Sequence, residues 1–218
     1  AALVIAPQLT APAPVTYSTS AHVRTIALDD GSRIELAPRS RLTMSGRDQA
    51  RIALEGGAYF DIVHDPSREL AVDAGGVRIS DIGTRFDVLS AAQGVRVAVE
   101  EGTVSVSGKD LAAPIVLPAG RAVRFDFAQG TAQTTAIEAS AVGQWRTGRL
   151  TFQGAPLRVV AAELARYAGA EVTVSPSVSD RLFSGTLVIR DGNAAIRDLA
   201  RLMDLPLSGG DGAWRLGP

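Results

Sequence analysis

The sequence predicts a mainly β fold followed by a small α+β unit. Residues 21–127 consist almost entirely of short strand signals separated by frequent turns, which is the pattern of an all-β unit. Residues 128–143 are small and polar and are expected to be a linker, and residues 144–218 then alternate strands with helical segments. We expect a solenoid-like stack in the all-β unit, although a sandwich, a barrel or an irregular β-helix would satisfy the same pattern.

Residues 1–20 carry a different composition from the unit that follows. Residues 1–6 are apolar and stop at Pro7, without the Met or basic residues of an intact signal peptide. Residues 7–20 are rich in Pro, Ser and Thr, as in an extended linker. We expect the apolar start to be either the outer end of a membrane helix or an apolar arm.

A β-hairpin opens the all-β unit. Apolar and polar residues alternate at 22–28 and 33–36, and between them Gly31 offers the positive φ that a tight turn needs. The other strands expected in this unit are 40–44, 51–54, 58–63, 70–72, 77–82, 85–89, 95–99, 103–106, 115–117 and 122–127. Glycine precedes many of them at irregular spacing, so the strands are not a repeat of fixed period.

The tail is predicted to have the order β-α-β, then β-α-β. After a strand at 150–153, Pro156 starts a helix, since proline is favoured at the first helical position, and Gly169 ends it. Asp191 caps a second helix that extends to about Met203. The apolar face of the first helix is expected to hold Leu157, Val160, Ala161, Leu164 and Tyr167 or Ala168. The remaining expected strands are 171–174, 182–189 and 213–216.

Composition argues against several kinds of site. The net charge of −1 gives no electrostatic footprint for nucleic acid, and aromatic residues, at 5%, are too sparse for a stacking platform. The chain has no Cys and only two His, so neither a thiolate nor a His-based metal cluster is expected. No glycine pattern for phosphate binding opens a helix. We therefore expect no cofactor, no metal and no small-molecule substrate.

Acidic pairs and the lone His64 do not indicate an enzyme. The pairs at 29–30 and 100–101 each stand beside a glycine where a strand ends, which turn preference explains. His64 has no partner motif and is expected to be structural. The main alternative function is a β-solenoid carbohydrate-active enzyme or binding module. That class needs a groove with clustered acids and aromatics, which this sequence does not indicate.

A series of motifs resembles one protein family. The segments are VRTIALDDGSRIEL at 23–36, GAYFDI at 57–62, IGTRFDV at 82–88, VEEGTV at 99–104 and PAG at 118–120. Together they resemble FecR-type sensors, the inner-membrane regulators of sigma factors in bacterial cell-surface signalling. The residues that carry this resemblance are Asp30, Gly31, Ser32, Gly57, Phe60, Gly83, Thr84, Phe86, Glu101, Gly102 and Gly120.

The tail extends the resemblance. WRTGRLTFQGAPL at 145–157 and ELARY at 163–167 resemble the closing region of the same proteins, a secretin and TonB N-terminal (STN) type domain. The resemblance implies a periplasmic region anchored to the inner membrane by a helix N-terminal to this chain. It would receive the signalling domain of a TonB-dependent outer-membrane transducer, loaded with a ferric siderophore or a similar ligand. The sigma factor would be held by a cytoplasmic region absent from this chain.

Gly83 and Thr84 are the candidate site of a covalent event. Some FecR-type sensors split themselves at the Gly-Thr of this motif, with the Thr hydroxyl attacking the preceding carbonyl. By resemblance, Thr84 would be the nucleophile and Gly83 the acyl donor. The structural alternative is that Gly83 permits a bend and Thr84 caps it through its hydroxyl. Turnover catalysis is not expected, and exposed strand edges are the expected binding surfaces.

Overall fold

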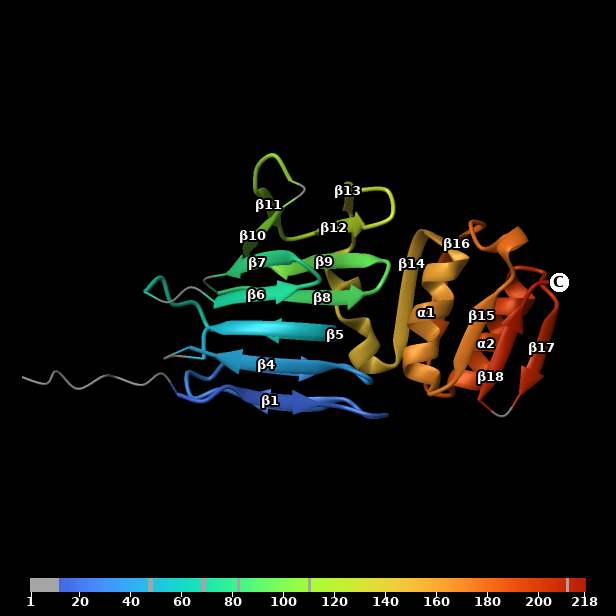
Figure 1. Cartoon of the computed structure of the whole chain (residues 1–218), viewed down its shortest axis with the longest axis horizontal. Coiled ribbons are helices and arrows are strands. Elements are labelled where there is room, and N and C mark those ends of the chain that lie inside the picture. The colour runs from blue at the N-terminus through green and yellow to red at the C-terminus, as the bar shows by residue number, and fades with distance from the viewer. Residues whose placement is uncertain (1–11, 47–48, 68–69, 82, 110, 211) are drawn as a thin grey trace, which may run out of the picture.

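The computed structural model describes residues 12–46, 49–67, 70–81, 83–109, 111–210 and 212–218. The apolar start at 1–6 and Ile82 of the signature motif lie outside these ranges. Within them, no helix combines the length and the apolar character needed to cross a bilayer. The described chain has an all-β unit at one end and an α+β unit at the other, with helix α1 (Leu157–Ala168) at their junction (Figure 1).

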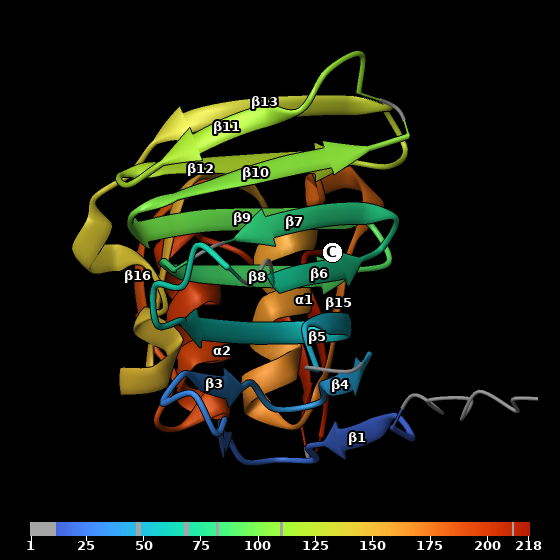
Figure 2. The same cartoon turned by 90° about the vertical axis from the view of Figure 1, so that its left-hand side faces the viewer.

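The all-β unit is a stack of strand rungs that climbs from β1 to β13 (Figure 2). Its strands among the described residues are β1 (Val15–Ser18), β2 (Arg24–Ala27), β3 (Arg33–Leu36), β4 (Arg41–Ser45), β5 (Arg51–Asp61), β6 (Leu70–Ala74), β7 (Val77–Asp81), β8 (Arg85–Ala91), β9 (Gly94–Glu101), β10 (Thr103–Gly108), β11 (Ile115–Pro118), β12 (Arg121–Asp126) and β13 (Thr131–Ala136). This arrangement confirms the predicted class of a β unit built from many short strands.

Strand β5 joins two sheets. Its first half pairs with β4 and β6, and its second half pairs with β3 and β8. The first sheet therefore runs β1-β4-β5-β6-β7-β10-β11, and the second runs β2-β3-β5-β8-β9-β12-β13. The sequence predicted two separate strands at 51–54 and 58–63, and this was wrong. Gly56 has φ +93°, a conformation open to glycine, so the strand bends there and continues instead of turning back.

The core of the β unit lies between the two sheets. It combines Ile52 and Leu54 of the first sheet with Phe60, Phe86 and other apolar residues of the second. Because side chains alternate between the faces of a strand, every second residue of these strands points into this core. The second sheet also buries its other face, which packs against the C-terminal unit.

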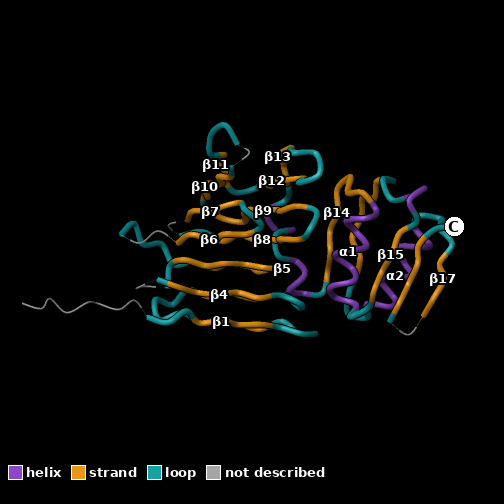
Figure 3. The backbone as a smooth tube through the Cα atoms, viewed as in Figure 1, coloured by secondary structure: helices purple, strands orange, loops and turns teal. Residues whose placement is uncertain are grey.

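The C-terminal unit contains two helices and two small sheets (Figure 3). Its elements are β14 (Arg149–Pro156), α1, β15 (Glu171–Val174), β16 (Leu182–Val188), α2 (Gly192–Leu202), β17 (Leu207–Gly210) and β18 (Ala213–Leu216). Strand β14 pairs with β16, and β18 pairs with β15 and β17. Leu157, Val160, Ala161 and Leu164 of α1 are buried, as the helical spacing predicts.

The predicted end of α1 and start of α2 are confirmed, but Pro156 precedes α1 as the last residue of β14 and is not its first helical residue. Three strands were not expected. Gly169 ends α1 with φ +65°, and the Asp191 carboxylate accepts a hydrogen bond from the Ala194 N–H at the start of α2. Strands β1, β13 and β17 lie where polar or Gly-rich composition favoured loops. Of these, β1 falls within the expected linker 1–20 and β13 within the expected linker 128–143. Strand β13 lacks the apolar alternation on which strand prediction depends, whereas in β1 Val15 and Tyr17 do alternate with polar residues.

Candidate functional site

Motifs that are far apart in the sequence meet at one end of the second sheet. The register places Arg33, Asp61, Arg85 and Glu101 side by side across β3, β5, β8 and β9. Their charges alternate along this row, and Arg85 forms an ion pair with Glu101. We call this end of the sheet the signature rim, because most of the residues that carry the family resemblance lie on or next to it.

The turn at Asp30, Gly31 and Ser32 fastens the hairpin to the end of β5. The Asp30 carboxylate accepts hydrogen bonds from the Ser32 N–H and hydroxyl at 2.8 and 3.0 Å. The Ser32 hydroxyl in turn accepts one from the Val63 N–H at 3.0 Å. Gly31 has φ +88°, which the turn requires. These three signature residues therefore have a structural role.

Gly83 and Thr84 are enclosed at the same rim. Gly83 has φ +141°, and a Cβ added there would lie 2.2 Å from the Cα of His64. Thr84 is buried, and its carbonyl accepts a hydrogen bond from the Ile62 N–H. A Cβ added at Gly102 would lie 2.4 Å from the Thr84 Cγ2. Glycine is thus needed at positions 83 and 102 for steric reasons, and Gly83 and Thr84 form a tightly packed bend.

The other signature residues organise the core and the sheet crossings. Phe60 and Phe86 stack in the core with ring centroids 4.8 Å apart. The Gly57 N–H donates to the Ser40 hydroxyl at 2.9 Å. Gly120, with φ +74°, carries the chain from β11 of the first sheet to β12 of the second. The structure therefore places the predicted site residues in the framework of the β unit.

A second constellation, which sequence reasoning missed, lies on the outer face of the second sheet. Phe86 and Val88 point into the core of the β unit, so Asp87 between them points outward to the C-terminal unit. Because of the same alternation, the face of the sheet that packs against that unit carries both apolar and polar side chains. Its buried members are Ala37, Tyr59, Asp87, Ala98 and Ala122.

Trp145 joins the two units through a buried hydrogen bond. Its indole N–H donates to the Asp87 carboxylate at 2.7 Å, and both side chains are buried. Burial raises the pKa of Asp87, while Arg96, 3.8 Å away, and the Trp145 hydrogen bond lower it. The bond fixes the orientation of the linker that leads from β13 into the C-terminal unit.

Arg146 makes a second polar contact between the units. Its guanidinium lies 3.5 Å from the centre of the Tyr59 ring and donates to the Glu35 carboxylate at 2.9 Å. Tyr59 donates its hydroxyl hydrogen to Glu100, and burial together with this bond raises the pKa of Tyr59. We call the contacts of Trp145 and Arg146 with the second sheet the polar seam.

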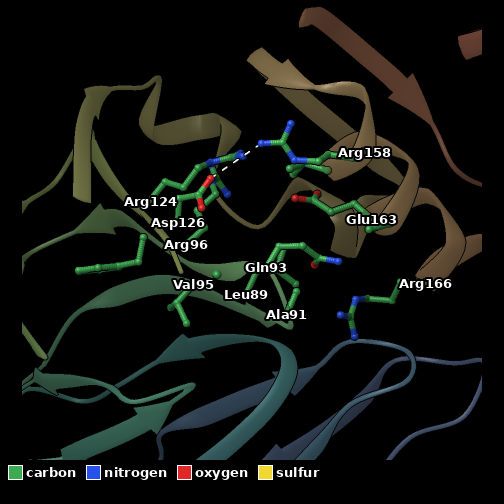
Figure 4. Close-up of a pocket in the computed structure, with 14 residues that line it drawn as sticks. Leu89, Ala91, Gln93, Val95, Arg96, Arg124, Asp126, Arg158, Glu163 and Arg166 are labelled. Carbon is green, nitrogen blue, oxygen red and sulfur yellow. Dashed lines mark ion pairs between the residues drawn. The ribbon is translucent and has the colours of Figure 1, made fainter. Parts of the chain in front are cut away.

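A crevice opens beside the polar seam, between the second sheet and helix α1 (Figure 4). Its charged lining comes from both units: Arg96, Arg124 and Asp126 on the sheet, and Arg158, Glu163 and Arg166 on α1. The Arg166 guanidinium is turned toward the β unit, where it donates to the carbonyls of Pro38 and Arg39. We call this hollow the arginine crevice. Within the described parts of the chain, no group of three His, Asp or Glu side chains is placed to hold a metal ion.

Comparison with known proteins assigns the β unit. Residues 15–105 match the family model of the FecR protein. The chain contains a FecR domain. The match ends within β10, and strands β11 to β13 continue the same two sheets beyond it. No curated protein sequence matches the chain.

The fold of almost the whole chain recurs in solved structures. Two crystal structures, each of a candidate anti-sigma factor from Parabacteroides distasonis, superpose with TM-scores of 0.85 and 0.83 at 18% identity. They cover 94% and 93% of this chain, and 99% and 98% of their own. The folds of the β unit and the α+β unit therefore recur together, in the same order, in these structures.

Proposed function

We propose that this chain is the signal-receiving region of a sigma-factor regulator. The main support is the combination of a FecR domain with a fold shared, over nearly the whole chain, by a candidate anti-sigma factor. The polar seam adds a physical argument: it holds the FecR domain and the α+β unit together, so that a contact on one changes the other. The region acts by binding proteins and not by catalytic turnover.

The proposed partner is the signalling domain of a TonB-dependent outer-membrane transducer that responds to a ferric siderophore or a similar ligand. The region would lie in the periplasm, held by a membrane helix on its N-terminal side, and would relay the signal to a sigma factor bound by a cytoplasmic region. The α+β unit is proposed to be of the STN type. These statements rest on the sequence motifs, and the FecR match is consistent with them.

The edge strand β13 is a suitable receiving surface. All of its residues are exposed, and it carries none of the charges or prolines that protect a sheet edge. The Ile137 N–H donates to the Gly120 carbonyl, so this pair is hydrogen-bonded. In an antiparallel pair of strands, hydrogen-bonded and non-hydrogen-bonded residues alternate. The N–H and C=O groups of Ala132, Thr134 and Ala136 therefore point away from β12. A partner strand could pair with these groups and extend the second sheet.

Titration calorimetry with purified transducer signalling domains tests this proposal. We expect one of them to bind, and we expect Thr134→Pro to remove binding because it deletes an outward N–H donor. Thermal unfolding of the variant shows whether it stays folded. Binding that Thr134→Pro leaves unchanged would move the partner to another surface, and failure of every transducer from the same genome would refute the proposal.

A second proposed activity is a single self-cleavage at Gly83 and Thr84. The Thr84 Oγ would attack the Gly83 carbonyl carbon, its proton would pass to the departing amide nitrogen, and the resulting ester would be hydrolysed by water. The products are a Gly83 carboxylate and a fragment with a free Thr84 amine. The positive φ of Gly83 favours this proposal, because a constrained backbone lowers the barrier to leaving the amide form. Denaturing mass spectrometry of fresh protein should show two fragments that Thr84→Ala abolishes, whereas only full-length chain in both would refute it.

A further inference from the structure

The arginine crevice has the properties of a small-ligand site. Its volume is about 90 Å³, and it adjoins a second, larger hollow of about 450 Å³. The residues that line both are Arg96, Arg124, Asp126, Arg158, Val159 and Glu163. A ligand in this position would touch the FecR domain and the α+β unit at the same time.

Two opposite charges in the crevice make no direct polar contact with another side chain that the structure describes. In the described part of the chain, neither the Arg124 guanidinium nor the Glu163 carboxylate forms a hydrogen bond or an ion pair within 4.0 Å. Both side chains are half-buried, and burial lowers the pKa of Arg124 and raises that of Glu163, while each charge partly offsets the shift of the other. In Figure 4, Glu163 points from α1 across the hollow toward Arg96 and Arg124 on the sheet. Partly buried charges without a hydrogen bond or a close ion pair are costly, so a complementary ligand would be stabilised here.

The neighbouring charges are already engaged. Arg158 forms ion pairs with Asp126 and Asp180, and Arg96 lies 3.8 Å from Asp87. An anion alone would pair with Arg124 but would meet the like charge of Glu163. A cation alone would pair with Glu163 but would meet the like charge of Arg124. The smallest ligand that pairs both groups carries a carboxylate and an ammonium.

The smaller hollow supplies an apolar wall next to these charges. The apolar side chains that line it are Leu89, Ala91, Val159 and Ala162. Its volume of about 90 Å³ is below the roughly 150 Å³ of an apolar cavity that holds benzene, so it suits a short aliphatic chain. The carboxylate, the ammonium and the aliphatic chain together define one class of molecule.

We propose that the arginine crevice binds a free aliphatic α-amino acid. Its carboxylate would pair with Arg124 in the two-pronged geometry that a guanidinium offers, and its ammonium would pair with Glu163. Its side chain would enter the hollow beside Leu89 and Val159. Because Arg124 belongs to the β unit and Glu163 to α1, the ligand holds the two units together and stabilises the folded chain by mass action.

Calorimetry and thermal unfolding with L-leucine test the proposal on the unmodified chain. We expect saturable binding and a rise in the unfolding temperature. 4-Methylpentanoate lacks the ammonium and 3-methylbutylamine lacks the carboxylate, so each should bind at least about tenfold more weakly, the factor that 1.4 kcal/mol represents. The proposal is overturned if none of leucine, valine and alanine shows saturable binding. It is also overturned if 4-methylpentanoate binds as tightly as leucine, because the crevice would then be a simple anion site.

Variants assign the two contacts. Arg124→Gln and Glu163→Gln should each weaken leucine binding at least about tenfold. Arg121→Gln, on the same strand but outside the crevice, should leave it unchanged. The opposite outcome is that each single variant lowers the unfolding free energy of the ligand-free chain and that the double variant lowers it no further. Arg124 and Glu163 would then pair directly with each other, and the proposal fails. Transducer binding is measured separately, so either proposal can fail alone.

Discussion

The hydrogen bond from Trp145 to Asp87 makes Trp145→Phe a direct test of how the two units are joined. Phenylalanine keeps an aromatic ring in the site but removes the indole N–H, which donates to the Asp87 carboxylate at 2.7 Å. Asp87 is only 4% exposed, so water cannot replace the lost donor without opening the junction. The remaining charge partner, Arg96, lies 3.8 Å away.

The expected loss of stability follows from these contacts. A buried hydrogen bond to a charged group contributes about 1.5–3 kcal/mol. The smaller ring also leaves a void and adds about 1 kcal/mol. We therefore expect Trp145→Phe to lower the free energy of unfolding by about 2.5–4 kcal/mol.

Urea unfolding followed by circular dichroism measures this loss without relying on tryptophan fluorescence. Trp214→Phe is the matched control, because its indole N–H donates to the Asn193 side chain at 2.9 Å in an exposed contact. It should cost about 1 kcal/mol or less. If Trp145→Phe costs no more than Trp214→Phe, the buried contact does not hold the units together and the reasoning is refuted.

Three further predictions use the same unfolding measurement. Gly102→Ala should lower the free energy of unfolding by at least about 2 kcal/mol, because the new methyl group clashes with Thr84 at a position that already has a positive φ. Gly130 also has a positive φ but lies in open space, so Gly130→Ala should cost only about 1–2 kcal/mol. Equal losses in the two variants would contradict the steric argument. Asp191→Ala removes the cap of α2 and should cost about 1 kcal/mol, and an unchanged stability would show that the cap is dispensable. Burial raises the pKa of Asp87, so its contribution to stability is full below its unfolded pKa and is lost as the pH rises through its folded pKa. Asp87→Asn should therefore gain stability relative to the parent chain as the pH rises from about 4 to about 8, and a difference independent of pH would contradict this.

Local patterns were enough to predict the class of the fold. The hairpin around Gly31 and the helix ends at Gly169 and Asp191 depend on residues close in sequence, and the structure confirms them. The path of β5 does not depend on local signals. Gly56 and Gly57 are typical of a turn, and only the different partners on either side show that the strand continues from one sheet to the other.

The polar seam could not be predicted from sequence, because its partners are far apart. Trp145 and Asp87 are separated by 58 positions, and both lie in motifs that were singled out for their resemblance. One signal was present. In β9, Val97 and Val99 alternate with the small Ala98, which indicates that both faces of the strand are covered. A sheet that is buried on both faces needs a second packing partner, and the C-terminal unit is that partner.

Signal reception by protein binding is the central claim, and one titration tests it most directly. Signalling domains of the TonB-dependent transducers from the same genome would be titrated calorimetrically into the full chain. We predict saturable one-to-one binding by one of them, accompanied by a higher unfolding temperature of the complex. If none of these domains binds, the chain does not receive its signal from a transducer.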